Sequence, residues 1–221
     1  MLDLDGTVVS VSWNLNEILK TRSKIISRLR DLGIEEETLS PNMATWKIID
    51  VIRKKYGESV VRKARKIIYE TLDPLDLATE KNAKIIGDAE KVIRELRRKM
   101  IKIVLVTYRS RASTISLLKK LKLYELFDLI ITRDDVEEAK PHPQHFAKAL
   151  SMLRLKANNV LVVSDLPEDL KTAMRLGFKV AAVLTGLGKK EDFLEAGVNV
   201  ICKDLSCIPK ILEELETASL V

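Results

Sequence analysis

The sequence predicts an α/β protein in which a doubly wound parallel sheet carries an inserted α-helical unit. From Gly87 onward, short runs rich in β-branched apolar residues alternate with segments whose apolar residues recur at helical spacing. Residues 10–85 instead have helical spacing with few strand signals. We therefore expect residues 1–9 and 86–221 to form an α/β core domain, and residues 10–85 to form a helical domain inserted into it.

The chain opens with a short apolar segment, residues 1–9, that carries Asp3 and Asp5. Side chains alternate faces along a strand, so the two carboxylates point the same way, and Gly6 lets the backbone turn directly after them. Two like charges so close need a cation or a proton to neutralise them, which favours a metal or phosphoryl site. An ordinary Asp-Gly-Thr turn is the alternative. Because only two residues precede Asp3, we expect the natural start to lie upstream of Met1.

Apolar residues at helical spacing predict four helices in the inserted domain. Their expected ranges are 13–33, 40–57, 58–72 and a short segment after Pro74. Gly33 and Gly57 end the first two, because glycine favours the left-handed conformation that closes helices. The third should stop at Pro74, which lacks the N–H group that a helix interior needs. The domain is therefore expected to be a small helical bundle.

Polar residues follow the expected strands of the core at the points where the strands end. They are Thr107 after residues 101–106, Lys140 after residues 129–132, and Asp165 with Asp169 after residues 160–164. In an open parallel sheet the carboxyl ends of the strands face one crevice, where ligands bind. We therefore expect these side chains to meet the two N-terminal aspartates there.

Each of these residues also has an ordinary structural interpretation. Thr107 is a residue type that favours strands, Lys140 fits a solvated loop, and Asp165 fits a helix N-cap before Pro167. Their joint occurrence at matching strand ends favours a functional site over four independent coincidences.

Together these residues resemble the haloacid dehalogenase (HAD) superfamily of phosphatases and phosphomutases, and the chain looks like its phosphoglycolate phosphatase-like members. The four motifs of that family are matched in order by Asp3–Thr7, Thr107, Lys140–Pro143, and Ser164-Asp165 with Asp169. Four motifs in register are far more specific than any one of them. The resemblance implies a Rossmann-like HAD core, with the inserted helices forming a cap domain.

The resemblance also implies roles for the motif residues. Asp3 is expected to be the nucleophile that attacks phosphorus, and Asp5 the general acid and then the general base. Thr107 is expected to donate a hydrogen bond to a phosphoryl oxygen, while Lys140 supplies positive charge beside it.

A magnesium ion and a phosphorylated substrate complete the site that the resemblance implies. The expected metal ligands are Asp3, the backbone carbonyl of Asp5, Asp165 and Asp169, because Mg²⁺ prefers oxygen ligands. The expected substrate-binding residues are Thr107, Tyr108, Arg109 and Lys140. A solvated loop arginine is the alternative for Arg109.

The function expected from these residues is magnesium-dependent hydrolysis of a small phosphorylated metabolite through an aspartyl-phosphate intermediate. A phosphomutase of the same family shares every motif, and a non-catalytic phospho-ligand-binding or regulatory module is a third reading. A dehalogenase has no need of the second aspartate as proton donor or of magnesium carboxylates. Sugar phosphates, phosphoglycolate and nucleoside monophosphates all remain open as substrates.

Composition sets further expectations. No apolar run reaches membrane-spanning length and no signal peptide precedes the first motif, so we expect a cytoplasmic protein without a membrane partner, monomeric or homodimeric. Basic residues are interleaved with acidic ones and aromatics are few, so no nucleic-acid partner is expected. Abundant Lys, Arg and Glu suggest a thermophilic source. Cys202 and Cys207 are expected to be free thiols, and His142 and His145 to lie at a surface turn and helix start.

Overall fold

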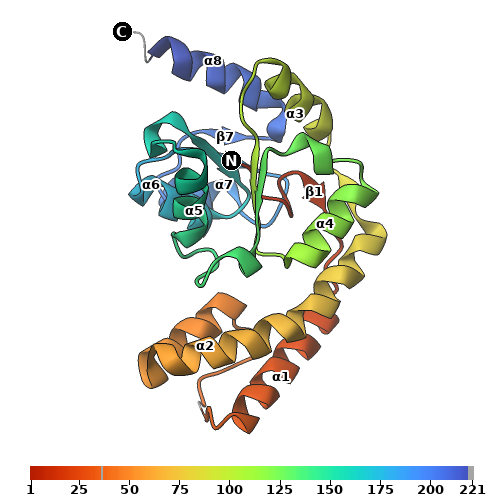
Figure 1. Cartoon of the computed structure of the whole chain (residues 1–221), viewed down its shortest axis with the longest axis vertical. Helices are drawn as coiled ribbons and strands as arrows, with labels where there is room; N and C mark the ends of the chain where they lie inside the picture. Colours follow the sequence, from red (N-terminus) through yellow and green to blue (C-terminus); the bar gives the residue numbers. More distant parts are fainter. Residues whose placement is uncertain (36, 219–221) are drawn as a thin grey trace. The chain divides into compact units, whose positions relative to one another are not determined.

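The computed structural model describes residues 1–35 and 37–218 and divides the chain into two compact units. One unit, the α/β unit, consists of Met1–Val11 and Ala83–Val221, and the other, the helical unit, of Ser12–Asn82. Figure 1 traces the order of helices and strands along the chain. The predicted α/β fold is confirmed, and each unit has its own internal structure.

A parallel sheet forms the centre of the α/β unit. Its named strands are β3 (Val104–Val106), β4 (Leu129–Ile131), β5 (Leu161–Ser164), β6 (Lys179–Val183) and β7 (Ile201–Cys202). β3 pairs with β4, β5 pairs with β6, and β6 pairs with β7, all in parallel. Leu2 bridges Leu105 of β3 and Val163 of β5, so the N-terminal segment lies between these strands as the central member of the sheet.

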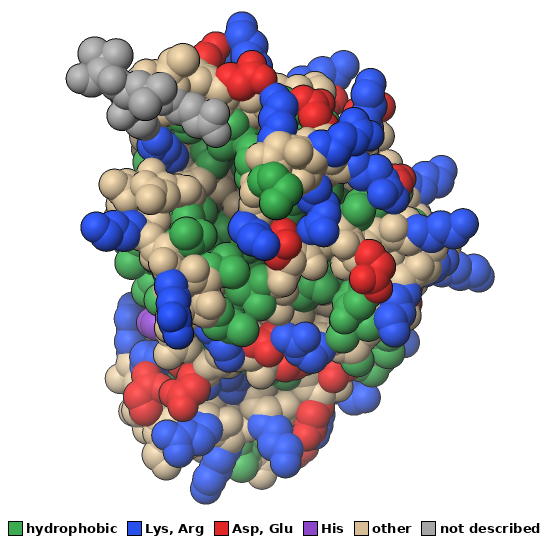
Figure 2. Space-filling model, turned by 45° about the horizontal axis from the view of Figure 1, so that its top comes forward, with side chains coloured by type: hydrophobic (Ala, Val, Ile, Leu, Met, Phe, Trp, Pro, Cys, Tyr) green, Lys and Arg blue, Asp and Glu red, His purple; other side chains and the backbone are tan. Residues whose placement is uncertain are grey.

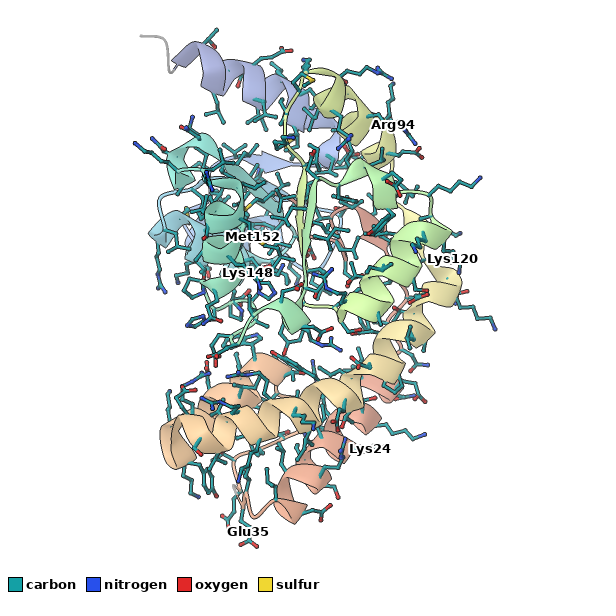
Figure 3. All side chains as sticks on the ribbon, viewed as in Figure 1. Lys24, Glu35, Arg94, Lys120, Lys148 and Met152 are labelled. Carbon is teal, nitrogen blue, oxygen red and sulfur yellow. A yellow bond between two sulfur atoms is a disulfide. The ribbon has the colours of Figure 1, made fainter. Side chains whose placement is uncertain are left out.

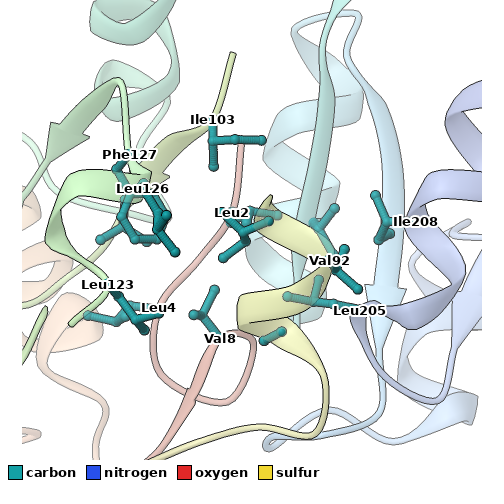
Figure 4. Close-up of a cluster of buried hydrophobic side chains, with 14 of the residues drawn as sticks. Leu2, Leu4, Val8, Val92, Ile103, Leu123, Leu126, Phe127, Leu205 and Ile208 are labelled. Atoms are coloured by element: carbon teal, nitrogen blue, oxygen red, sulfur yellow. The ribbon is translucent and has the colours of Figure 1, made fainter. Parts of the chain in front are cut away.

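Helices cover both faces of this sheet, as a doubly wound fold requires. They are α3 (Ala89–Arg98), α4 (Arg111–Lys120), α5 (Gln144–Leu153), α6 (Pro167–Arg175), α7 (Lys190–Glu195) and α8 (Ile208–Ala218). Successive side chains of β3 enter opposite cores: Leu105 packs with residues of α3, α4 and α8, and Val104 with residues of α5, α6 and α7. Figure 4 shows part of the first core around Leu2 and Leu4. Burial on both faces explains why the strands read as continuous apolar runs.

The amino group of Met1 is buried at the start of the central segment. It donates a hydrogen bond of 2.7 Å to the backbone oxygen of Leu161, and so takes the place of a backbone N–H donor in the strand ladder. The backbone N–H groups of Leu2 and Asp3 donate to Val104 and Val163, so both neighbouring strands are paired along this short segment. Because water is excluded, burial lowers the pKa of the amino group from 8.0 to about 5.

The chain beginning at Met1 is therefore expected to lose stability as the pH falls. Between pH 8 and pH 5 the unfolded chain binds a proton at this amino group that the folded chain does not, so lowering the pH favours unfolding. From pH 8 to pH 6.5 the free energy of unfolding should fall by about 1.5 kcal/mol through this group. Urea titrations followed by far-UV circular dichroism at the two pH values measure the change.

A variant extended by Ser-Val-Ile before Met1 isolates the amino group in this measurement. The extension replaces the buried amine with an amide N–H that does not titrate, while other buried groups such as Asp165 and His145 stay the same. The pH dependence should become weaker by the stated amount. An equal slope in both chains would contradict the assignment.

Cys202 and Cys207 form a disulfide, so the prediction of free thiols is wrong. The bond ties β7 to η5 (Leu205–Cys207), the short helix that leads into α8. Free thiols were expected because disulfides are rare in the cytoplasm. Between the two cysteines the chain turns at Asp204, whose side chain accepts a hydrogen bond from the backbone N–H of Ser206.

Reduction of this disulfide is expected to destabilise the α/β unit by about 2 kcal/mol, because it frees a short closed loop in the unfolded chain. Thermal melts with and without a phosphine reductant measure the loss without changing any side chain. A Cys202→Ala, Cys207→Ala variant serves as the control, since its melting temperature should no longer respond to reductant.

The helical unit contains α1 (Leu15–Asp31) and α2 (Thr45–Thr79). Asn14 caps α1 by accepting hydrogen bonds from the backbone N–H groups of Asn16 and Glu17. The second and third predicted helices form one run that is broken at Gly57, whose φ of 75° lies in the left-handed region. The predicted stop at Pro74 is wrong, because α2 continues to Thr79, where buried residues on both sides of the proline keep the helix packed. The fourth helix is thus the end of α2.

A two-stranded antiparallel ribbon joins the segments on either side of the inserted residues. β1 (Val9–Ser10) pairs with β2 (Lys84–Ile85), Val9 opposite Ile85. Within the described residues, no helix combines the length and apolarity that crossing a bilayer requires. Figure 2 shows Lys and Arg side chains interleaved with Asp and Glu across the face in view.

Candidate active site

The aspartates of the first motif lie where the central segment of the sheet ends. Asp3 is buried, and its backbone N–H donates to Val163 of β5. Gly6 then turns the chain with a φ of 78°, and a Cβ atom built on it would lie 2.4 Å from Oδ2 of Asp165. Only glycine fits this turn without displacing Asp165, because it combines a left-handed backbone with the absence of a side chain.

Lys140 joins two of the predicted carboxylates. Its Nζ lies 2.7 Å from Oδ1 of Asp3 and 2.7 Å from Oδ2 of Asp169, and the lysine side chain is only 5% exposed. Burial by itself lowers the pKa of Lys140, but Asp169 and Asp3 outweigh it, so the pKa stands above its usual range. Lys140 is therefore a permanent buried cation between two carboxylates.

Asp165 lies beside this group at the end of β5. The backbone N–H of Leu187 donates to its Oδ2 at 3.0 Å, and the hydroxyl of Thr7 donates to its Oδ1 at 3.4 Å. Burial, followed by the charge of Asp3, raises the pKa of Asp165 to about 7. Burial also raises the pKa of Asp169. Three buried carboxylates thus lie in this group, and the ammonium of Lys140 contacts those of Asp3 and Asp169.

This donor set fits a magnesium ion. Its atoms are hard oxygen donors, and they belong to buried carboxylates of which two contact the ammonium of Lys140. Among the described residues, no three His, Cys, Asp or Glu side chains form a ready-made metal cluster. Mg²⁺ does not need one, because it keeps several waters and binds proteins through few carboxylates. Asp3, Asp165, Asp169 and the backbone carbonyl of Asp5 remain the ligands that sequence predicts.

Thr107 and Arg109 follow β3 at the same end of the sheet. The Thr107 side chain is buried, and its hydroxyl oxygen accepts a hydrogen bond from the backbone N–H of Arg109, leaving the hydroxyl proton for another acceptor. Nε of Arg109 lies 2.8 Å from Oδ2 of Asp5. The alternative of a solvated loop arginine is wrong, because the side chain is buried and ion-paired. Its predicted contact with substrate stays a prediction.

Tyr108 is turned toward a different arginine. Its backbone oxygen accepts a hydrogen bond from Nη1 of Arg133, whose guanidinium carbon lies 6.0 Å from the centre of the tyrosine ring. Tyr108 is half-buried. Its predicted role in substrate binding therefore stays a prediction as well.

His145 is a buried residue that the sequence reasoning placed at the surface. Its Nδ1 accepts the backbone N–H of Lys140 at 2.9 Å, and it is fully buried on the face of α5 that also carries Ala149. Burial, followed by the charge of Lys140, lowers the pKa of His145 to about 3. The i, i+4 spacing of His145 and Ala149 was the available signal for a buried position. His142 is exposed, as expected.

The loop after β6 was also missed. Gly186 packs so closely on Asp165 that a Cβ atom would overlap its carboxylate, and the next residue, Leu187, donates to the same group. Two glycines, Gly186 and Gly188, follow the strand within five residues of its end, which is the sequence signal for close backbone approach.

A cavity of about 500 Å³ lies elsewhere in the α/β unit, beside β4. Its lining includes Ile130 and, from α5, Lys148 and Met152, which Figure 3 labels. It contains none of the predicted site residues. The candidate active site is instead the buried group of charges at the strand ends.

Comparison with known proteins agrees with this geometry. A family model described as haloacid dehalogenase-like hydrolase matches residues 1–183. Pyrophosphatase PpaX of Bacillus cereus (strain B4264) is 33% identical over 204 residues, which cover 89% of this chain and 87% of that protein. The solved structure of a hydrolase from Pseudomonas syringae has a TM-score of 0.65 at 20% identity, covering 96% of each chain. A candidate β-phosphoglucomutase from Thermotoga maritima has a TM-score of 0.62 at 19% identity, covering 96% of this chain and 97% of that one. The chain therefore belongs to the haloacid dehalogenase-like hydrolases and is an enzyme of their phosphatase branch.

Proposed function

We propose that this enzyme hydrolyses a small phosphomonoester with the help of magnesium, through a phosphoryl group carried on Asp3. The observation that supports this most directly is the buried group of Asp3, Asp169 and Lys140, in which a permanent cation lies 2.7 Å from both carboxylates. Phosphoryl transfer depends mainly on positioning and charge neutralisation, and this group supplies both.

The proposed reaction has two steps. A carboxylate oxygen of Asp3 forms a bond to phosphorus while the ester oxygen departs, taking a proton from the carboxyl group of Asp5. A water molecule then attacks phosphorus, Asp5 takes its proton, and Asp3 is released with orthophosphate. Thr107 and Lys140 stabilise the charge on the phosphoryl oxygens. Magnesium, when bound by Asp3, Asp165, Asp169 and the carbonyl of Asp5, supplies further neutralisation of that charge.

The nature of the substrate is a finer proposal. The relatives named pyrophosphatase make inorganic pyrophosphate a second candidate beside small phosphomonoesters. The helical unit is proposed to act as the cap domain that controls access of water and substrate, a common role of lids over reactive sites. Cytoplasmic location, thermophilic origin and monomeric or homodimeric state stay predictions from the composition.

Hydrolysis of p-nitrophenyl phosphate and of pyrophosphate, each with magnesium and after chelation, tests the proposal. We expect orthophosphate release that disappears on chelation and returns with Mg²⁺. Ca²⁺ should not restore it, because the larger ion prefers more ligands and a less regular geometry. Conversion of a sugar phosphate to its isomer without orthophosphate release would indicate a mutase instead. Orthophosphate release that is unaffected by chelation would overturn the magnesium proposal.

A further inference from the structure

We propose that Arg109 is a positioning residue that holds the carboxylate of Asp5 in place for proton transfer. The inference rests on the proposed role of Asp5 as general acid and base. Nε of Arg109 lies 3.0 Å from Oδ1 and 2.8 Å from Oδ2 of Asp5, so one donor holds both oxygens of this carboxylate. Such a contact fixes the rotation of the carboxyl group as well as its distance.

Arg109 is the more deeply buried partner of this pair. Its side chain is 2% exposed, whereas that of Asp5 is 23% exposed. An arginine is almost never fully buried unless it is paired. The carboxylate is therefore the partner nearer the surface, where a substrate can approach, and the guanidinium contacts it from the interior of the protein.

The position of Arg109 is itself fixed by the start of α4. Its Nη1 donates to the hydroxyl of Ser113 at 2.7 Å, and its backbone N–H donates to the hydroxyl of Thr107. Ser110 caps the same helix by accepting the backbone N–H of Ser113. These contacts come from the protein alone, so the guanidinium is held before any substrate binds.

The two buried cations of the site therefore serve different carboxylates. Lys140 contacts Asp3 and Asp169, and Arg109 contacts Asp5. A guanidinium stays charged and does not exchange protons at physiological pH, so Arg109 cannot itself be the general acid or base, and its effect on proton transfer must pass through Asp5. Its removal should impair steps that need a proton from Asp5 and spare steps that do not.

Leaving groups of different basicity separate these two kinds of step. p-Nitrophenyl phosphate and phenyl phosphate have similar shapes, but phenolate is the more basic leaving group and gains more from protonation as it departs. The ratio kcat/KM reports events up to the departure of the leaving group, and excludes the later hydrolysis of the phosphoryl group on Asp3. Loss of positioning at Asp5 should therefore lower kcat/KM much more for phenyl phosphate.

The experiment compares Arg109→Met, Arg109→Lys and Asp5→Asn with Arg111→Met on both esters. Arg111 is the control, because it lies two residues after Arg109, at the start of α4, and pairs with an aspartate, Asp135, outside the candidate site. We expect Arg109→Met to lower kcat/KM about tenfold to 100-fold more for phenyl phosphate than for p-nitrophenyl phosphate. Arg109→Lys should recover part of the loss, since it keeps the charge without the planar donor.

A double variant completes the test. If Arg109 acts only through Asp5, Asp5→Asn combined with Arg109→Met should be no slower than Asp5→Asn alone. Equal losses on both esters, or losses that multiply in the double variant, would overturn the inference and leave the proposed hydrolysis standing. A wild-type enzyme that cleaves neither ester with magnesium would instead remove the proposed hydrolysis itself. Thermal melts identify any variant that fails to fold, in which case Arg109→Lys decides the result.

Discussion

Asp3→Asn is expected to abolish phosphate ester hydrolysis, lowering kcat by about 10⁴-fold or more. The amide keeps the size and shape of the carboxylate, but it cannot act as the nucleophile toward phosphorus. It also removes the negative oxygen that Lys140 contacts at 2.7 Å. Release of p-nitrophenol by wild type and variant at saturating substrate and magnesium measures the loss.

Asp50→Asn is a suitable control, because Asp50 is a half-exposed carboxylate that pairs with Arg53 in the helical unit. It should retain wild-type turnover. A second readout locates the reaction: rapid acid quenching followed by borohydride reduction converts a carboxyl phosphate to an alcohol, which mass spectrometry should find at Asp3. Hydrolysis that persists in Asp3→Asn would rule out the proposed nucleophile.

Lys140→Met is expected to reduce stability as well as activity. Removing the ammonium leaves Asp3 and Asp169 buried without their shared cation, and breaking a buried ion pair in this way costs about 3–5 kcal/mol. The measurement is best made at pH 8, where protonating a buried carboxyl group to relieve the repulsion costs more free energy than at neutral pH. Urea unfolding of wild type and variant without metal gives the difference.

Magnesium should restore part of this stability, because a cation that binds only the folded protein shifts unfolding by mass action. The recovery on adding Mg²⁺ should be larger in Lys140→Met than in wild type. Lys171→Met, at an exposed position on α6, serves as the control and should be nearly neutral. A Lys140→Met protein as stable as wild type in the absence of metal would contradict the account of the charges.

The parts of the fold that sequence could predict depend on repeating patterns. The apolar runs of β3 and β5 are predictable, because strands that are buried on both faces of a sheet carry apolar residues throughout. The positions of Thr107 and Asp165 then follow from where those strands end. The expectation that polar strand ends meet at one edge of a parallel sheet needed no knowledge of side-chain conformation.

The features that sequence did not predict depend on contacts between residues that no repeating sequence pattern links. Pro74 lies inside α2 because packing on both sides outweighs the missing hydrogen bond, a balance that local propensity does not contain. His145 is buried, and its Nδ1 accepts a hydrogen bond from the backbone N–H of Lys140, a contact that helical spacing alone does not reveal. The pairing of Arg109 with Asp5 joins residues that are far apart in the sequence, so it emerged only from the three-dimensional arrangement.

The ribbon of β1 and β2 means that the chain leaves the α/β unit and returns to it through two strands that are paired with each other. Val9 lies opposite Ile85, so a tight reverse turn of a few residues would be enough to join these strands in place of the insert. Replacing the insert with a different segment would therefore leave the order of the strands in the sheet unchanged. The inserted residues and the sheet can therefore change independently of one another in evolution.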